Sequence, residues 1–235
     1  MYLSIVIPAY NEEKRIKATL LRIYGFLRTK DYNYEIIIVD DGSTDKSVLE
    51  VQQSQLFKEG NLRVIKNRKN TGKGFSVKRG ILASKGDYVL FSDADLSTPI
   101  EELDKLFGYI NDGYDIIIGS RGKKDSDVKV HQPWHREKMG KIFNVFVKSM
   151  LFKEFNDTQC GFKLFKGDIA REIAQLLKFN GFSFDVEMIY LARKKGYNLK
   201  EIGVVWENSP KSKVKVIGSS FNMFLDLFKI KALHK

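Results

Sequence analysis

Several common features are missing from this sequence, and each absence excludes a kind of structure. Cys160 is the only cysteine in 235 residues, so no disulfide can form within the chain. No uncharged apolar run reaches the roughly 18–20 residues that a membrane-spanning helix requires. The three histidines form no arrangement typical of a metal site. His131 and His135 have helical spacing, but Pro133 lies between them, so we interpret both as loop residues.

The amino-terminal residues also carry no recognisable signal peptide, because a strand is predicted at residues 3–7. The apolar fraction of 43% and the aromatic fraction of 12% are sufficient for a substantial core. Nothing in the composition indicates disorder, and no repeats are visible. We therefore expect one large domain, or a domain with an appendage.

Positive charge is abundant, and its distribution is uneven. The net charge is +11. Residues 121–153 contain nine Lys and Arg and three acidic residues, and residues 211–235 contain six Lys and one acidic residue. The rest of the chain is balanced. This segregation favours an anionic partner, either a membrane surface or a nucleic acid, over two ordinary solvated faces.

Strand-length apolar runs alternate with amphipathic segments through the first 120 residues. Strands are predicted at residues 3–7, 36–39, 62–65, 88–91 and 115–119. Helices are predicted from about residue 12, with Asn11 as the N-cap, to residue 27, and at residues 46–57, 75–83 and 101–110. This alternation predicts an α/β fold with a mostly parallel sheet and helices on both of its faces.

The second half of the chain has a different sequence pattern. Residues 122–135 have no regular period and are predicted to form a mobile loop beside the substrate. Residues 136–152 and 216–233 are predicted to form basic amphipathic helices. Such helices could lie at a membrane interface, or they could simply cover the sheet.

Polar side chains follow three of the predicted strands at the point where each strand ends. They are Tyr10 and Glu12, Asp40 and Asp41, and Asp93 and Asp95. The carboxyl ends of parallel strands meet at one edge of a sheet, where α/β proteins bind ligands. Lys73 begins a helix near the same edge. Each feature alone could be a turn, but together they suit a nucleotide and a hard cation bound through carboxylate oxygens.

These segments resemble the motifs of family 2 glycosyltransferases with the GT-A fold. The motifs are Ile7-Pro8-Ala9-Tyr10-Asn11-Glu12, Val39-Asp40-Asp41-Gly42-Ser43-Thr44-Asp45, Asn70-Thr71-Gly72-Lys73-Gly74 and Asp93-Ala94-Asp95. Later segments are similar to the dolichyl-phosphate β-glucosyltransferases, relatives of the polyprenyl-phosphate mannose synthases: Gly119-Ser120-Arg121, Asp157-Thr158-Gln159-Cys160-Gly161-Phe162-Lys163, Phe184-Asp185-Val186-Glu187 and Val205-Trp206. The resemblance spans nearly the whole chain. It implies one Rossmann-like GT-A domain over residues 1–235, in which residues 1–120 bind the nucleotide sugar and residues 121–235 bind the acceptor.

The resemblance also implies roles for individual residues on the donor side. The nucleotide sugar would be bound by Pro8, Ala9, Tyr10, Glu12, Asp40, Asp41, Lys73, Asp93 and Ala94, with Asp40 and Asp41 holding the uracil and ribose. Asp93 and Asp95 would bind Mg²⁺ or Mn²⁺, which bridges the diphosphate. Mannose synthases can carry a further Gln ligand two residues after the second Asp. Ser97 stands at that position here and is a weaker ligand.

The chemistry of the acceptor decides whether a general base is needed. A polyprenyl phosphate has a second pKa of about 6, so it is largely ionised at neutral pH and needs little help. Its phosphate would be held by cations, for which Arg121, Arg136 and Lys163 are the candidates. A sugar hydroxyl would need a base, and Asp157 and Asp185 are the candidates, with Arg121 beside them as a catalytic cation. Asp157 could instead be a turn residue and Asp185 a helix N-cap.

The resemblance therefore implies an inverting transferase that moves glucose from UDP-glucose to a polyprenyl phosphate. The enzyme would be attached peripherally to the cytoplasmic face of a membrane, and a homo-oligomer is compatible with the sequence. Alternatives are a GDP-mannose donor, a non-lipid glycan acceptor and a non-catalytic nucleotide-binding protein. A nucleic-acid-binding protein is not expected, because the basic segments lack a recognised motif with interleaved aromatic residues.

Overall fold

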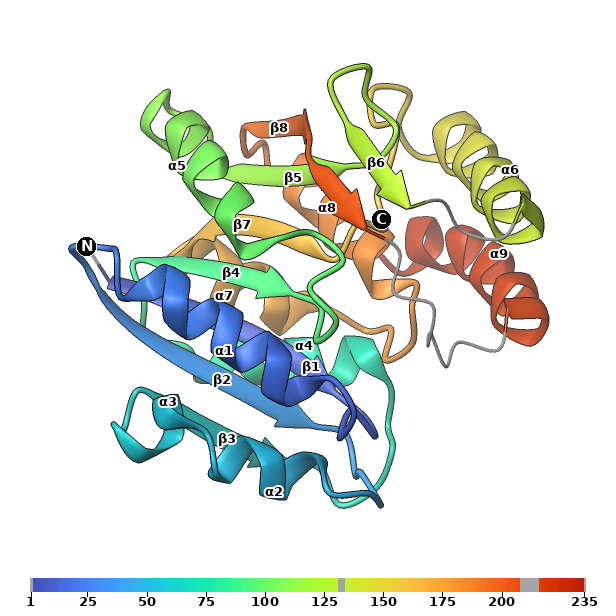
Figure 1. Cartoon of the computed structure of the whole chain (residues 1–235). Helices are drawn as coiled ribbons and strands as arrows, with labels where there is room; N and C mark the ends of the chain where they lie inside the picture. Colours follow the sequence, from blue (N-terminus) through green and yellow to red (C-terminus); the bar gives the residue numbers. More distant parts are fainter. Residues whose placement is uncertain (1, 131–133, 208–215, 235) are drawn as a thin grey trace.

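The computed structural model describes residues 2–130, 134–207 and 216–234, without the side chains of residues 135, 136 and 216–221 (Figure 1). Its elements in chain order are β1 (Tyr2–Ala9), α1 (Ile16–Leu27), β2 (Asn33–Asp40), α2 (Ser47–Gln52), α3 (Gln55–Lys58), β3 (Leu62–Lys66), α4 (Lys73–Ala83), β4 (Tyr88–Ser92), the 3₁₀ helix η1 (Ile100–Glu102), α5 (Leu103–Asn111), β5 (Ile116–Ser120), β6 (Asp127–Val130), α6 (Trp134–Met150), β7 (Phe162–Lys166), α7 (Gly167–Leu176), α8 (Phe184–Lys194), β8 (Leu199–Gly203), β9 (Val205–Glu207) and α9 (Val216–Leu233).

A seven-stranded sheet in the order β3-β2-β1-β4-β7-β5-β8 lies at the centre of the molecule. Neighbouring strands are parallel except at β7, which runs antiparallel between β4 and β5. The predicted mostly parallel sheet is therefore confirmed. Both halves of the chain contribute strands to it. The assignment of donor to the first half and acceptor to the second stays a prediction.

Hydrophobic side chains fill both sides of this sheet. Along β1, Ile5 and Ile7 belong to one buried cluster, whereas Val6 between them belongs to another. Residues alternate between the two clusters in the same way along β2. Successive strand side chains point to opposite faces, so a strand that is apolar throughout is covered on both faces. In Figure 1, α1 and α5 cover one face, and α4, α7 and α8 cover the other.

Two helix predictions in the first half were wrong in detail. Helix α1 begins at Ile16 rather than after Asn11. Asn11 has a left-handed φ of 55°, and its Oδ1 accepts hydrogen bonds from the backbone N–H groups of Thr44 and Asp45. It therefore ties the loop after β1 to the loop after β2 instead of capping a helix. The single helix predicted over residues 46–57 is two helices, the second capped by Ser54.

The loop predicted at residues 122–135 was also partly wrong. Strand β6 lies within it and pairs in parallel with β9. Most of β6 is exposed, so it carries no apolar alternation that a sequence pattern could reveal. Helix α6 begins at Trp134, which places His135 in a helix rather than a loop. His131 and Pro133 lie outside the described residues.

The predicted basic helices at residues 136–152 and 216–233 correspond to α6 and α9, which lie side by side at one end of the molecule (Figure 1). The rings of Phe146 and Phe224 meet edge to face at 4.7 Å between centroids. Leu227 and Ile230 of α9 are fully buried in the core. Within the described residues, no helix is both long enough and apolar enough to span a membrane.

Candidate active site

The loops after β1 and β2 are joined by hydrogen bonds at the carboxyl edge of the sheet. Asp41 N–H donates to Ala9 O at 2.8 Å. Asn11 N–H donates to Ser43 Oγ at 2.9 Å. The structure thus brings together the strand ends that the sequence placed at one edge, and the ends of β1, β2 and β4 form the frame of the candidate site.

Lys73 and Asp93 form an ion pair at this edge, with 2.7 Å between Nζ and Oδ1. The ammonium also lies 5.2 Å from the centre of the Phe91 ring, a cation–π contact. Burial by itself lowers the pKa of Lys73, but the carboxylates of Asp93 and Asp185 outweigh burial and raise the pKa. Lys73 therefore stays positively charged and adjoins the acidic residues that end β4.

The second carboxylate of the Asp93-Ala94-Asp95 segment is balanced by an arginine. Asp95 Oδ2 lies 3.8 Å from Arg15 Nη1, and Arg15 also pairs with Glu12. Burial and the neighbouring charge of Asp93 raise the pKa of Asp95. Sequence reasoning missed Arg15. The one available signal was its spacing of three residues from Glu12 at the start of a helix.

Asp93 and Asp95 are suited to share one divalent cation. Among the described residues, no group of three or more His, Cys, Asp and Glu side chains could hold a metal. Mg²⁺ and Mn²⁺ are commonly held by one or two carboxylates, together with water and substrate phosphates. A cation between these two carboxylates would also relieve the repulsion that raises the pKa of Asp95. The residues present therefore fit a metal shared with a diphosphate.

Asp41 organises the turn that carries Lys73. Its Oδ1 accepts hydrogen bonds from Asn67 Nδ2 at 2.6 Å and from Thr71 N at 3.0 Å, and its Oδ2 accepts one from Gly72 N at 2.8 Å. The predicted contact of Asp41 with a nucleotide would have to share these oxygens. Asp40 makes one such bond, from Ser43 N–H to Oδ1 at 3.2 Å.

Two glycines allow close backbone packing around Lys73 and Asp93. Gly72 has a φ of 116°, and a Cβ there would overlap Asn180 O. A Cβ at Gly161 would overlap the Asp93 carboxylate, and Asp93 N–H donates to Gly161 O at 3.0 Å. Gly161 reaches Asp93 because β7 runs antiparallel beside β4. No pattern in the sequence indicates that these two residues are neighbours.

Arg121 and Asp157 form a bidentate pair, with 2.6 Å from Nε to Oδ2 and 2.9 Å from Nη2 to Oδ1. Burial alone would raise the pKa of Asp157, but the Arg121 guanidinium outweighs burial and lowers the pKa to about 2. A carboxylate held this firmly as an anion is a poor general base at neutral pH. Both oxygens of the Asp157 carboxylate are engaged by Arg121, and a role for Asp157 as a base stays a prediction.

Lys163 and Asp185 form a second pair, which is completely enclosed. The Lys163 side chain has no exposed surface, and its Nζ donates to Asp185 Oδ1 and, at 2.7 Å, to Cys160 O. The Lys163 ammonium is enclosed in this conformation and paired with Asp185, and its predicted contact with an acceptor phosphate stays a prediction. Burial raises the pKa of Asp185 and outweighs the opposing effects of Lys163 and Lys73.

Asp185 is not the N-cap of α8, because that position belongs to Ser183. Its side chain is almost fully buried, so a substrate hydroxyl has no direct access to the predicted base. Arg136 lies on α6, but its side chain is outside the described part of the structure. Of the three predicted phosphate-binding cations, Arg121 alone has a described and partly exposed side chain.

Residues 4–174 match the family model described as Glycosyl transferase family 2. The chain belongs to glycosyltransferase family 2. Within this family it is 37% identical to the dolichyl-phosphate β-glucosyltransferase of Dictyostelium discoideum, over 98% of this chain and 74% of the relative. It is 33% identical to the human dolichyl-phosphate β-glucosyltransferase, over 97% of this chain and 74% of the relative.

Solved structures support the same fold for this family 2 chain. A crystal structure of glucosyl-3-phosphoglycerate synthase from Mycobacterium tuberculosis in complex with UDP is similar with a TM-score of 0.70. The likeness covers 97% of this chain and 79% of that chain at 19% sequence identity. At this identity the comparison shows the fold alone, and it agrees with the GT-A fold that the motifs imply.

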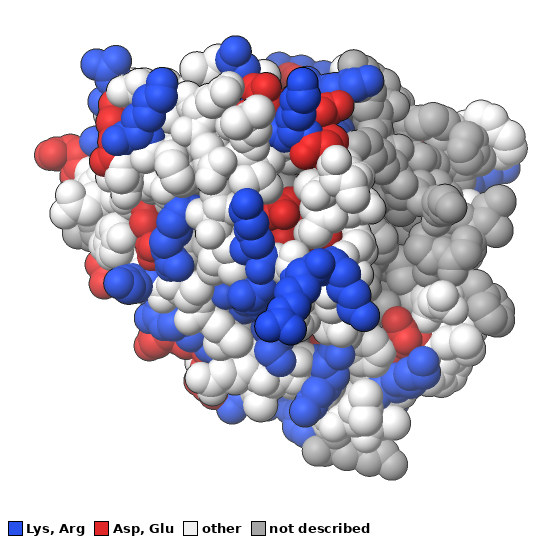
Figure 2. Space-filling view, turned by 90° about the horizontal axis from the view of Figure 1, so that it is seen from below, with Lys and Arg blue, Asp and Glu red and all other residues white. Residues whose placement is uncertain are grey.

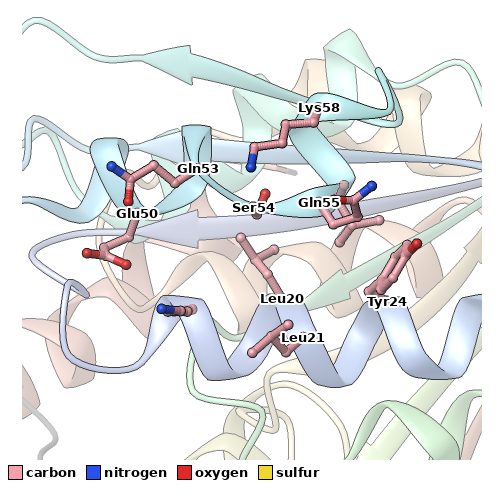
Figure 3. A pocket seen from close by; sticks show the side chains of 10 residues that line it. Leu20, Leu21, Tyr24, Glu50, Gln53, Ser54, Gln55 and Lys58 are labelled. Atoms are coloured by element: carbon pink, nitrogen blue, oxygen red, sulfur yellow. The ribbon is translucent and has the colours of Figure 1, made fainter.

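A separate pocket of about 350 Å³ lies between α1 and the α2–α3 segment (Figure 3). Leu20, Leu21 and Tyr24 line it from α1, and Glu50, Gln53, Ser54, Gln55 and Lys58 line it from the opposite side. None of the residues predicted to bind the nucleotide sugar or the metal lines this pocket. It is therefore distinct from the candidate active site.

Proposed function

We propose that this family 2 glycosyltransferase moves glucose from UDP-glucose to a polyprenyl phosphate of the dolichyl-phosphate type. The single observation that carries this proposal is the similarity to dolichyl-phosphate β-glucosyltransferases over nearly the whole chain. The charged cluster at the carboxyl edge of the sheet supplies groups that a nucleotide sugar requires. GDP-mannose is the alternative donor, and the transfer assay described below distinguishes the two.

On the donor side, the nucleotide would lie across the ends of β1, β2 and β4. Pro8, Ala9, Tyr10, Glu12, Asp40, Asp41 and Ala94 would surround the base and ribose. The Tyr10 side chain is 39% exposed and could offer its ring to the base. Asp93 and Asp95 would hold Mg²⁺ or Mn²⁺, which when bound supplies positive charge to the departing diphosphate. The structurally similar glucosyl-3-phosphoglycerate synthase has been solved with Mn²⁺ and UDP-glucose.

During transfer, an oxygen of the acceptor phosphate would attack the anomeric carbon from the face opposite UDP. The bond between that carbon and the β-phosphate oxygen would break, with its electron pair leaving on UDP, and the configuration would invert. Lys73 would stabilise the charge that develops on the diphosphate, because its ammonium lies beside Asp93 at the same edge of the sheet.

On the acceptor side, Arg121 would hold the incoming phosphate, with Asp157 fixing the orientation of its guanidinium. Arg136 would contribute a second cation. A lipid phosphate needs no strong base, and the pKa of about 2 for Asp157 therefore suits this acceptor better than a sugar hydroxyl.

Helices α6 and α9 would provide the membrane contact. Both carry exposed apolar side chains: Trp134, Ile142 and Val145 on α6, and Leu225, Phe228 and Leu233 on α9. Lysines occur on the same helices, a composition that suits anionic lipid surfaces. Figure 2 shows that Lys and Arg side chains also gather near the middle of the face seen from below. Through these helices the protein would lie peripherally on the cytoplasmic surface of the membrane.

A transfer assay tests the proposed reaction. The protein would be incubated with Mn²⁺, dolichyl phosphate and either UDP-glucose or GDP-mannose, and the glycolipid and nucleotide products would be quantified. We expect glucosyl-phosphoryl-dolichol and UDP in equal amounts, and loss of product with Asp95→Asn. Turnover with GDP-mannose alone would overturn the donor assignment. Nucleotide binding without transfer to any acceptor would favour the non-catalytic alternative.

Vesicle flotation tests the membrane contact separately. We expect the protein to float with anionic vesicles, and a Val145→Ser/Phe228→Ser variant to float less, because both side chains are more than half exposed. Leu49→Ser, a change at an exposed apolar residue on α2, is the matched control. A wild-type protein that stays unbound would contradict the membrane surface assigned to α6 and α9.

A further inference from the structure

The side chain of Glu187 is fully buried. It has no role in the donor or acceptor chemistry proposed above. Its Oε1 accepts a hydrogen bond from Lys178 N at 2.8 Å, and its Oε2 accepts one from Phe179 N at 3.1 Å. The same Oε1 lies 2.7 Å from Nε2 of His234, just beyond α9. Two backbone N–H groups and one imidazole therefore meet on a single buried side chain.

The loop of residues 178–181, which Glu187 holds, packs against the turn that carries Lys73. Phe75 N–H donates to Asn180 O at 3.2 Å. A Cβ at Gly74 would lie 2.5 Å from Phe179 O, so the two backbones pack against each other without a side chain between them. Since Lys73 lies between Gly72 and Gly74, a displacement of residues 178–181 would move its ammonium relative to Asp93.

A second contact fixes the same loop to α9. Ser183 Oγ donates to Asp226 Oδ2 at 2.7 Å, and the Ser183 side chain is buried. The loop is thus held at both ends by polar contacts that involve the carboxyl-terminal segment, which is otherwise about 160 residues away from Lys73 in the sequence. These contacts link the packing of α9 to the geometry at the carboxyl edge of the sheet.

We propose that Glu187 and His234 are positioning residues for the nucleotide-sugar site, acting through residues 178–181 on the turn that carries Lys73. This inference rests on the proposed function in that the bound ligand would be UDP. Glu187→Gln would place an amide N–H₂ group against a backbone N–H or against the imidazole, leaving a buried donor unsatisfied. His234→Ala would remove one contact, whereas His234→Gln keeps a donor near the carboxylate.

Hydrogen exchange tests the positioning step without any ligand. We expect Glu187→Gln to speed amide exchange at Phe179 and also at Phe75, since the second amide is bonded to the loop. Glu172→Gln, at a half-exposed carboxylate paired with Lys195, is the matched control and should change neither amide. Faster exchange at Phe179 with unchanged exchange at Phe75 would overturn the inference.

Titration calorimetry with UDP and Mn²⁺ then tests the consequence. We expect Glu187→Gln and His234→Ala to weaken UDP binding by about tenfold at a temperature well below unfolding, and His234→Gln to recover most of the loss. The Michaelis constant for dolichyl phosphate should stay unchanged. Wild-type affinity in both damaged variants would refute the positioning role. A wild-type protein that binds no UDP would instead refute the proposed donor, and hydrogen exchange would still decide the role of Glu187.

Discussion

Replacing Asp157 with Asn removes one charge from a buried pair and leaves the shape of the side chain almost unchanged. The carboxylate accepts hydrogen bonds from the Arg121 guanidinium through both oxygens, from Arg121 N at 3.1 Å and from Gln159 N at 3.1 Å. An Asn amide offers one acceptor oxygen and would turn its N–H₂ group toward at least one of these donors. The guanidinium would then lose its fixed orientation.

The expected cost follows from the pKa of Asp157. The folded value is about 2. The unfolded value is about 3.9, and each unit corresponds to about 1.4 kcal/mol, so the ionised form stabilises the folded state by about 3 kcal/mol at pH 7. Because the folded pKa is the lower one, this contribution is complete above the unfolded pKa and is lost as the pH falls toward 2. Roughly half of it remains at pH 3.

Urea unfolding of the wild type and the Asp157→Asn variant at pH 7 and pH 3 measures this contribution. We expect a difference in the free energy of unfolding of about 3 kcal/mol at pH 7, in line with breaking other buried pairs, and about half that at pH 3. Asp31→Asn, at an exposed carboxylate, should show no difference at either pH. A pH-independent difference, or one below about 1 kcal/mol at pH 7, would refute the reasoning.

Three further substitutions or modifications probe the site. Lys73→Met removes the cation paired with Asp93, so it should lower kcat/KM for transfer by about a hundredfold with little change in folding. An unchanged rate would exclude Lys73 from the site. Cys160 should resist iodoacetamide at pH 8 and react only in urea, since burial and the charge of Asp157 raise its thiol pKa to about 11. Rapid labelling of Cys160 in the folded protein would contradict this. Gly161→Ala should weaken Mn²⁺ binding, because the added Cβ would displace the Asp93 carboxylate. Gly140→Ala, where open space surrounds the glycine, should leave Mn²⁺ affinity unchanged. Equal Mn²⁺ affinities in the two variants would show that the carboxylate tolerates a Cβ.

The sequence predicted the sheet and the donor-side cluster because both depend on local patterns. Strands that are apolar on both faces, such as β2, indicate a parallel sheet, and acids directly after such strands must meet at its edge. Asp93 and Lys73 could therefore be placed near each other without coordinates. The structure adds Arg15, whose pairing with Asp95 depends on how the loop after β1 folds back.

The acceptor side was harder to predict, because its residues are joined by long-range packing. Lys163 looks like a surface cation in the sequence, yet the antiparallel insertion of β7 places it in the core against Asp185. Asp157 is a candidate base in the sequence, and its pairing with Arg121 becomes visible only in the structure. Neither outcome is encoded in a period or a spacing, and both depend on which strands become neighbours.

The most direct test of the donor site is the dependence of UDP affinity on metal in the wild type and in Asp95→Asn. Calorimetric titrations with UDP would be made in Mn²⁺ and in EDTA for both proteins. If Asp93 and Asp95 hold a cation shared with the diphosphate, Mn²⁺ should tighten UDP binding to the wild type by at least about tenfold and should give Asp95→Asn little advantage. Equal UDP affinity with and without Mn²⁺ in the wild type, or the full Mn²⁺ effect in Asp95→Asn, would contradict the metal and diphosphate site at the end of β4.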